Sequence, residues 1–485
     1  MRRAAVVALS LLLLGAAPPP PPPSPTPPPA IGVTVAPVTG ALRTDAVLPG
    51  HLLAVALPRG ADGRRRLIAL TTPDDPQAEA APQGARSLYL IDPERSGAPR
   101  KLLDGISAEA DSLAAADLDG DGAEEILLGE PGRLLTLGSA DAPTAPRELL
   151  AAPGLDLRRQ AATPGVIQLA EVGRLRVWRL EGGLAAGGEW PLPVQAARER
   201  RSLRLSSPQV TPIAMAAGAP PVQAVGPEEN GKLRLRTLLL TPDGGQTESW
   251  SRLPGPETVD GFRYVAVDGQ PALIVTTADA EKVGVFAKQR FRLFPLGADR
   301  SRSGQPPTLA VETESNRWFP VDPVLLDLDK DGKQDLVLLQ PEGVGGGDLV
   351  IDTFFGQGVG RFERPRRLKL GNLESRAWIF GKDLTGDGVA DLAAFSQGGV
   401  RVFAGTADPR RELLDRRPWR TVDLEAPGRV EVSVGIGTGG METASSRAGL
   451  LGGPLAEDLD GDGRAEILLF SPNAGGRGRM KVIRF

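Results

Sequence analysis

The chain has 485 residues, enough for several domains or for one large repetitive domain, so length alone does not decide between them. Its 60 glycines, 46 prolines and 4% aromatic residues favour many short β-elements separated by turns over long helices on a bulky core. A formal net charge of −4 gives no general attraction to nucleic acid or anionic membranes, and the absence of cysteine excludes disulfides and thiolate metal sites.

The N-terminal segment has the layout of a secretory signal peptide. Residues 1–17, MRRAAVVALSLLLLGAA, combine two arginines, an apolar stretch and an end of small residues. We therefore expect an exported protein that resides in the periplasm, at the cell surface or in the medium. The apolar stretch is too short to cross ~30 Å of hydrocarbon comfortably, and we expect no transmembrane helix in the mature chain. The cleavage position stays open because Pro18 follows directly.

Residues 18–38 are expected to form a proline-rich linker. The run PPPPPPSPTPPP at 18–29 favours a solvated polyproline II rod, which would hold the folded part away from a membrane or wall. The remainder, residues 39–485, is expected to form one repetitive domain.

The domain contains a repeated unit of apolar strand, loop, apolar strand, turn and two further strands. Clear copies surround acidic loops, and weaker copies that lack the acids begin near residues 51, 165, 212 and 262. Four strands in a repeat of this length predict an all-β fold, a β-propeller with one repeat in each blade. Our count favours eight blades, with seven as the alternative. The last unit is one strand short, and TGALRTDAVL at 39–48 is expected to complete it and to close the ring.

Four acidic loops with the same spacing are the main candidate functional sites in the sequence. They read DLDGDGAEE from 117, DLDKDGKQD from 327, DLTGDGVAD from 383 and DLDGDGRAE from 458. Acidic side chains at positions 1, 3 and 5, a backbone carbonyl at 7 and a closing acid supply the oxygen ligands that calcium prefers, and glycine at position 6 permits the sharp turn. An EF-hand would need a glutamate at position 12 and flanking helices; position 12 is apolar and the flanks read as strands.

These spacings predict four structural calcium sites. Their expected ligands are Asp117, Asp119, Asp121, the carbonyl of Ala123 and Glu125; Asp327, Asp329, Asp331, the carbonyl of Lys333 and Asp335; Asp383, Thr385, Asp387, the carbonyl of Val389 and Asp391; and Asp458, Asp460, Asp462, the carbonyl of Arg464 and Glu466.

The repeated strand, D-x-D-x-D-G-x-x-[DE] loop and second strand resemble the FG-GAP and VCBS repeats of integrin-like propellers. FFGQGVGRF at 354–362 is similar to the phenylalanine- and glycine-rich stretch of those repeats. The resemblance implies a bladed propeller with calcium in its hairpin loops, often found on exported adhesion proteins or as an accessory module of enzymes. The chain departs from the pattern where Thr385 replaces an aspartate, and about half of the units lack the loop.

Other motifs favour structural roles. Gly435, Gly437 and Gly440 have dinucleotide-binding spacing, but no βαβ series surrounds them, so a flexible inserted loop is expected. His51 is the only histidine, which leaves a serine-type triad no other base. ARERRSLRL at 197–205 fits a charged edge strand better than a polyanion site.

The sequence thus favours a non-catalytic, monomeric calcium-binding propeller that binds a protein or glycan of the cell envelope. A carbohydrate-active enzyme on the same scaffold, a polysaccharide lyase or glycosidase, stays open because carboxylates from different blades can meet at a channel mouth. A scaffold for envelope assembly is the third possibility. Calcium that recruits a ligand, and acidic turns without metal, are the alternatives to structural calcium.

Overall fold

The protein is built from antiparallel β-strands, and the prediction of an all-β chain is confirmed. Among the residues that the computed structural model describes no α-helix occurs, and so no helix there is long and apolar enough to cross a membrane. Between residues 166 and 267 the structure gives mainly the course of the strands. Elsewhere it describes residues 30–38, 40–74, 83–152, 268–279, 282, 286–295, 306–316, 321–342, 348–371, 373, 377–396, 399–424, 454–471 and 477–485.

Within these residues the strands form nine sheets, and we name each sheet after its first strand. The β3 and β7 sheets each have four strands in chain order. Their strands are β3 (His51–Ala56), β4 (Leu67–Thr72), β5 (Arg86–Ile91) and β6 (Arg100–Ile106), followed by β7 (Ser112–Ala116), β8 (Glu125–Glu130), β9 (Arg133–Ser139) and β10 (Arg147–Ala151).

The next two sheets depart from the expected four strands, because the described part of the chain gives three strands to one and five to the other. The strands are β11 (Val166–Glu171), β12 (Arg174–Arg179) and β13 (Ala185–Pro191), then β14 (Val210–Thr211), β15 (Val222–Val225), β16 (Glu228–Glu229), β17 (Lys232–Leu240) and β18 (Gln246–Arg252).

Three further four-stranded sheets follow, and a two-stranded hairpin of β26 and β27 projects from the second of them. Their strands are β19 (Glu257–Val267), β20 (Gln270–Asp279), β21 (Lys288–Pro295) and β22 (Leu309–Asn316); β23 (Asp322–Leu326), β24 (Asp335–Glu342), β25 (Asp348–Phe354), β26 (Gly356–Gly358), β27 (Arg361–Phe362) and β28 (Arg366–Leu370); and β29 (Ala377–Lys382), β30 (Asp391–Phe395), β31 (Gly399–Phe403) and β32 (Arg420–Asp423).

Both ends of the chain contribute to one five-stranded sheet, the terminal sheet. Its strand order is β1-β2-β35-β34-β33, and β2 pairs with β35 from Leu42 opposite Arg484 to Val47 opposite Arg479. Strand β2 therefore lies next to β35, the last strand of the chain, within the segment 39–48 where the sequence analysis expected a strand. The strands are β1 (Gly32–Val38), β2 (Ala41–Val47), β33 (Leu455–Glu457), β34 (Glu466–Ser471) and β35 (Arg479–Arg484).

Strand β1 extends the β-structure into the segment that the sequence analysis assigned to the linker. It pairs along its whole length with β2, and Val33 exchanges two backbone hydrogen bonds with Gly97 of the neighbouring β3 sheet, at 2.6 and 2.8 Å. Val33 is buried. The alternation of valine with smaller residues after the prolines is a strand pattern, which the proline run obscured.

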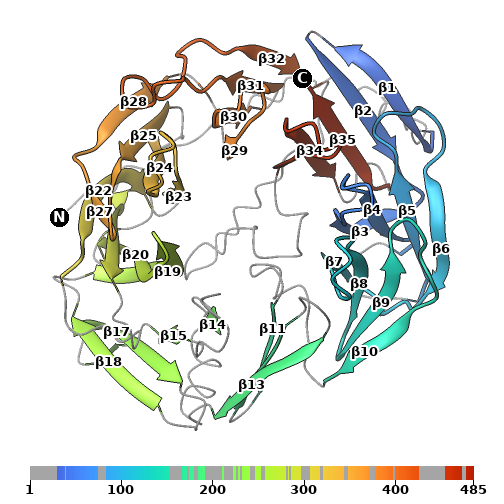
Figure 1. Cartoon of the computed structure of the whole chain (residues 1–485), viewed down its shortest axis with the longest axis horizontal. Helices are drawn as coiled ribbons and strands as arrows, with labels where there is room; N and C mark the ends of the chain where they lie inside the picture. Colours follow the sequence, from blue (N-terminus) through green and yellow to red (C-terminus); the bar gives the residue numbers. More distant parts are fainter. Residues whose placement is uncertain are drawn as a thin grey trace, which may run out of the picture.

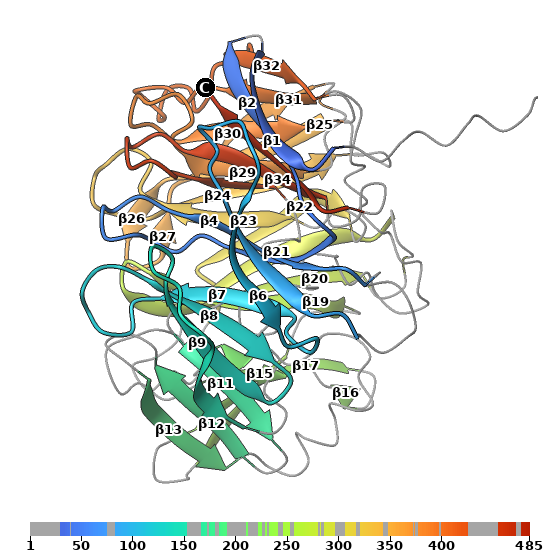
Figure 2. The ribbon, with the colours of Figure 1, turned by 90° about the vertical axis from the view of Figure 1, so that its right-hand side faces the viewer.

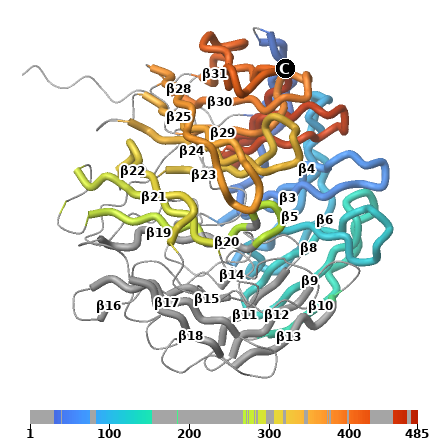
Figure 3. Tube along the Cα trace, turned by 60° about the vertical axis from the view of Figure 1, so that its left-hand side comes forward, coloured from blue at the N-terminus to red at the C-terminus, as the bar shows by residue number. Residues whose placement is uncertain are grey.

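The sheets follow one another in chain order around a common centre, as Figure 1 shows. Figure 2 gives the side view, in which β1 and β2 lie beside the strands of the β29 sheet. The β23 and β29 sheets also lie next to each other in Figure 3.

The hydrophobic core is divided among the spaces between neighbouring sheets. Between the β23 and β29 sheets, for example, Leu339 and Ile351 share one buried cluster with Leu392 and Phe403. All six residues of β4 are buried, because this strand has a neighbouring sheet on each face. A sheet buried on both faces needs apolar residues at successive positions, which explains the continuous apolar runs in the sequence.

The seam between the chain ends can be tested by placing a charge in it. Ala46 on β2 is 2% exposed and lies in the buried cluster between the terminal sheet and the β3 sheet, whereas Leu42 on the same strand is 45% exposed. We expect Ala46→Asp to lower the free energy of unfolding by about 3–5 kcal/mol, because the carboxylate would be buried without a partner. Leu42→Asp should change it little, and equal losses in chemical denaturation would contradict this account of the seam.

Candidate metal centres

The four predicted loops occupy the same place in four sheets, where each connects the first strand to the second. They lie between β7 and β8, β23 and β24, β29 and β30, and β33 and β34. In each hairpin the last residue of the first strand precedes the first aspartate, and the closing acid begins the second strand. The strand pairing therefore brings positions 1 and 9 of the loop together.

The carboxylate of the first aspartate holds each loop in a tight turn. Its two oxygens accept hydrogen bonds from backbone N–H groups further along the loop, at 2.7 Å (Gly120) and 3.0 Å (Gly122) for Asp117. The corresponding distances are 2.6 and 2.7 Å at Asp383 and 2.7 and 2.9 Å at Asp458. Asp327 makes the same turn through Asp331 and Gly332, at 3.1 and 2.9 Å.

Left-handed backbone at two loop positions explains the glycines. Gly120 and Gly122 have φ values of 80° and 89°, and a Cβ atom on Gly122 would meet nothing within 4 Å. Conformation and not crowding therefore selects glycine at that position. Lys330 adopts a φ of 59° where the other loops have glycine.

The next shared contact involves the residue at loop position 7, whose carbonyl is an expected ligand. In all four loops its N–H donates to the carboxylate at position 5. The distances are 2.8 Å for Ala123 to Asp121, 2.9 Å for Lys333 to Asp331, 2.9 Å for Val389 to Asp387 and 2.8 Å for Arg464 to Asp462.

The closing acids tie each loop to its sheet. One oxygen accepts the N–H of loop position 2, at 2.7 Å for Glu125, 2.9 Å for Asp335, 2.7 Å for Asp391 and 2.8 Å for Glu466. Asp335 and Asp391 use their other oxygen to accept, at 2.7 Å, the N–H of a glycine that follows the third strand. Burial raises the pKa of all four closing acids, while these backbone hydrogen bonds oppose the rise.

Three of the loops bring at least three carboxylates together. Ligand oxygens within each group lie within 4.8 Å of one another. The fourth loop has Thr385 where the others have an acid, and no group of three acids was found there among the described residues. The Thr385 hydroxyl is shielded from solvent without a hydrogen-bond partner. The three groups are Asp117, Asp119 and Glu125; Asp327, Asp329 and Asp335; and Asp458, Asp460 and Asp462.

The donor set of these loops fits a hard divalent cation. Three of the loops gather carboxylate oxygens into one small volume, and all four offer oxygen ligands at the expected positions without a histidine or a cysteine; calcium takes six to eight oxygens. Without a cation, several carboxylates at this spacing repel one another. The residues present therefore suit calcium better than zinc or a redox metal.

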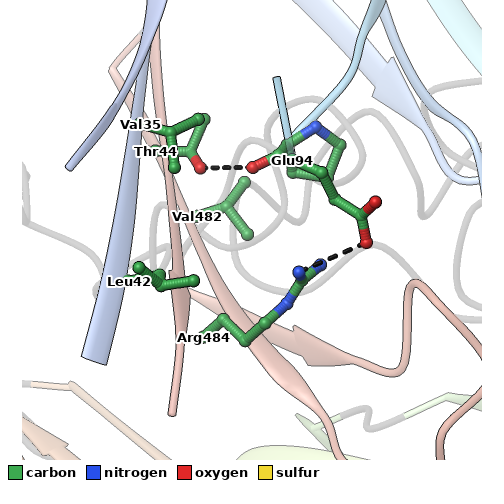
Figure 4. A pocket seen from close by; sticks show the side chains of 7 residues that line it. Val35, Leu42, Thr44, Glu94, Val482 and Arg484 are labelled. Atoms are coloured by element: carbon green, nitrogen blue, oxygen red, sulfur yellow. Dashed lines mark hydrogen bonds and ion pairs between the residues drawn. The ribbon is translucent and has the colours of Figure 1, made fainter. Parts of the chain in front are cut away.

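Arginines from distant parts of the chain contact two of the loops, and the sequence analysis did not anticipate them. Arg484 on β35 donates to Glu466 at 3.0 Å and lies 3.5 Å from Asp460 and 3.3 Å from Glu94 of the β3 sheet. Figure 4 shows Arg484 directed toward Glu94. Arg410 reaches the loop of Asp327 in the same way. Because both arginines lie outside the loop motifs in the sequence, no local pattern could predict these contacts.

The pocket beside Arg484 is too small for a substrate. Its volume is about 70 Å³, whereas ligand pockets usually measure ~300–1,000 Å³. Its lining residues are Val35, Leu42, Thr44, Pro93, Glu94, Val482 and Arg484 (Figure 4).

Backbone hydrogen bonds connect the hairpin loops of neighbouring sheets. The N–H just before the closing position donates to the adjacent hairpin, at 2.8 Å from Glu124 to the Arg59 carbonyl and 2.7 Å from Ala465 to the Asp383 carbonyl. Arg65 donates in the same manner to the carbonyl of Leu459, at 2.9 Å. These hydrogen bonds make each loop part of the junction between two sheets.

His51 lies in β3, is 8% exposed, and its Nδ1 has no hydrogen-bond partner. The glycine motif at 435–440 and the basic stretch at 197–205 lie outside the described residues.

Comparison with known proteins adds little to this geometry. No family model matches the chain, and no curated protein matches it. Among solved structures, the crystal structure of a protein from Lactobacillus plantarum is 13% identical, with a TM-score of 0.34, over 70% of this chain and 94% of that one.

The glycine after the third strand is open to a direct test. A Cβ atom on Gly356 would lie 2.3 Å from the carbonyl oxygen of Gln334, so Gly356→Ala must displace the N–H that Asp335 accepts. We expect it to lower the free energy of unfolding by about 1–3 kcal/mol. Gly371→Ala is the control, since its Cβ would lie 3.5 Å from Asp348. Equal melting temperatures for the two variants would refute this role of Gly356.

The buried closing acid Asp391 should give the metal-free protein an unusual pH dependence. Because burial raises the pKa of Asp391 in the folded state, the folded protein binds a proton at a higher pH than the unfolded chain does. In calcium-free buffer the contribution of Asp391 to stability should therefore rise as the pH falls through the folded pKa, and level off below the unfolded value of ~3.9. Asp391→Asn should lack this rise. Parallel stability–pH curves for the two proteins would contradict the prediction.

Proposed function

We propose that the protein is an exported, non-catalytic β-propeller of the FG-GAP and VCBS type. Its proposed form has eight four-stranded blades, and β2 closes the ring by completing the last one. The support is architectural: eight successive sheets of three or more strands, counted in the described part of the chain, surround a common centre (Figure 1), and the two chain ends share a sheet. Export rests on residues 1–17.

The observation that carries the proposal is the repetition of one oxygen-rich loop at one place in four sheets. Its first aspartate, its fifth-position acid and its closing acid make the same backbone contacts each time. A solvated acidic turn would not require the same internal geometry four times. In the proposed sites the carboxylates, the Thr385 hydroxyl and the carbonyls of Ala123, Lys333, Val389 and Arg464 hold calcium.

The proposed role of calcium is structural. Each loop supplies enough oxygens to complete the coordination of its own cation, which leaves little need for an external ligand. Ordering these loops would stiffen the junctions between sheets, and the propeller would present its loops to a protein or glycan of the cell envelope. We propose that the protein acts as a monomer in this role.

Removal of calcium tests the proposal. We expect the full chain to melt at a lower temperature in calcium-free buffer, because the crowded carboxylates then repel one another, and millimolar calcium to restore the loss, since extracellular sites of this type bind at ~10⁻⁴–10⁻³ M. The measurement is a thermal melt together with calorimetric calcium titration.

A matched variant makes the same test specific to one loop. Thr385→Asp adds the carboxylate that the Asp383 loop lacks and should raise the affinity of one binding step. Thr406→Asp, which adds the same charge in the β31–β32 connection, should leave the binding steps unchanged. Identical melts with and without calcium, together with no binding heat, would refute the metal sites.

A further inference from the structure

Arg410 belongs to one sheet but contacts the candidate metal loop of another. It lies in the connection between β31 and β32, and its guanidinium pairs through Nε with Asp329 of the β23 sheet. Its Nη2 atom lies 3.8 Å from Oδ2 of Asp331. Asp329 and Asp331 are positions 3 and 5 of the loop. Arg410 therefore pairs with two carboxylates that would also coordinate a cation bound in this loop.

The guanidinium is held in place on its other sides. Its carbon lies 4.6 Å from the centre of the Phe355 ring, and Phe355 is fully buried. Nη1 donates to Oε1 of Glu363 at 2.9 Å. A planar guanidinium against an aromatic face, with carboxylates at its edge, is a pre-organised arrangement. It differs from a solvated surface ion pair.

The connection that carries Arg410 is itself anchored. The backbone N–H of Asp415 donates to the Ala404 carbonyl at 2.9 Å, and the backbone N–H of Arg411 donates to the Asp408 carbonyl at 3.0 Å. Leu414 is fully buried in the cluster shared by the β23 and β29 sheets. Arg410 is therefore brought to the neighbouring loop by packed structure.

A cation in the loop and the guanidinium would compete for the same oxygens. Calcium needs the oxygens of Asp329 and Asp331 at 2.3–2.6 Å, and its double charge would repel a guanidinium at those groups. Glu363 lies outside the loop and can keep its hydrogen bond when Arg410 leaves the two aspartates. The displacement therefore requires only a small movement across the Phe355 ring.

The loop of Asp117 provides a comparison within the same molecule. Among the described residues no ion pair to Asp117, Asp119 or Asp121 is present; Arg65 of a neighbouring hairpin lies 3.6 Å from Glu124 at loop position 8 instead.

We propose that Arg410 is a built-in counter-ion of the Asp327 loop, which stabilises this loop when it holds no calcium and lowers its calcium affinity. Calcium entering the loop displaces Arg410 onto Glu363, and the binding event is thereby transmitted to the β31–β32 connection of the next sheet. This inference rests on the proposed function, in which the loops bind calcium.

The test is calcium titration of the full chain with Arg410→Met. Arg410→Met should strengthen one binding step by roughly fivefold or more, the range of a typical coupling between sites. In calcium-free buffer the same variant should melt at a lower temperature than the wild type, because the loop has lost its counter-ion. Arg416→Met is the control: Arg416 lies in the same connection and is 71% exposed, so its loss should leave every step unchanged.

Two further variants identify the loop concerned. In the Asp327→Asn background the strengthened step should be absent, and adding Arg410→Met should change none of the remaining steps. Glu363→Gln leaves Arg410 in place but removes its alternative partner, and it should weaken the same step. This variant also keeps the test decisive if Arg410→Met does not fold.

The outcomes separate the two proposals. A wild-type protein that binds no calcium refutes the proposed function. Calcium binding that Arg410→Met and Glu363→Gln both leave unchanged refutes only the role of Arg410, as does an equal effect of Arg416→Met.

Discussion

The closing carboxylate of the acidic loops, completely buried at Asp335 and Asp391, is the constraint on which the rest of the hairpin depends. In Asp335 and Asp391 one oxygen accepts the N–H of loop position 2 and the other accepts the N–H of the glycine after the third strand. One side chain thus fixes the loop to three strands. Because a buried charge without partners is costly, the backbone groups around it must be in place before the hairpin is stable.

The parts of the fold and of the candidate sites that could be predicted from the sequence are those set by local residue patterns. The loops, their flanking strands and the closing strand at 39–48 are local patterns, in which spacing and apolar alternation determine the geometry. Gly356 is also local: the phenylalanine- and glycine-rich stretch puts a residue without Cβ where the chain passes the Gln334 carbonyl. The calcium interpretation of the loops stays a prediction.

The remaining features depend on contacts between residues far apart in the sequence. Arg410 is 81 residues from Asp329, and Arg484 approaches Asp460 only because β35 lies beside β2 and β34. No local pattern distinguishes these arginines from solvated ones. Strand β1 was missed for a different reason, since the preceding prolines concealed a short valine alternation, and it is stabilised by the β3 sheet through Gly97.

In the β3–β4 hairpin a side-chain cation, rather than a bound ion, neutralises an aspartate of the loop. Its loop keeps the Asp-Gly step at Asp62 and Gly63, with φ of 80° at the glycine, but Arg66 stands at the spacing of the closing acid. The Arg66 guanidinium donates to Asp62 at 3.0 Å and to Asp141 of the β7 sheet at 2.9 Å.

A covalently attached cation therefore does at this junction what we propose calcium does at others. Arg410 and Arg484 represent an intermediate case, in which an acidic loop is retained and a guanidinium from outside the loop pairs with it. The three arrangements solve one electrostatic problem, the crowding of carboxylates at the hairpin between sheets. They differ in whether the positive charge can be exchanged. If calcium binds as we propose, only the loops whose positive charge is exchangeable would respond to its concentration, and the junctions at those sheets would change in stiffness.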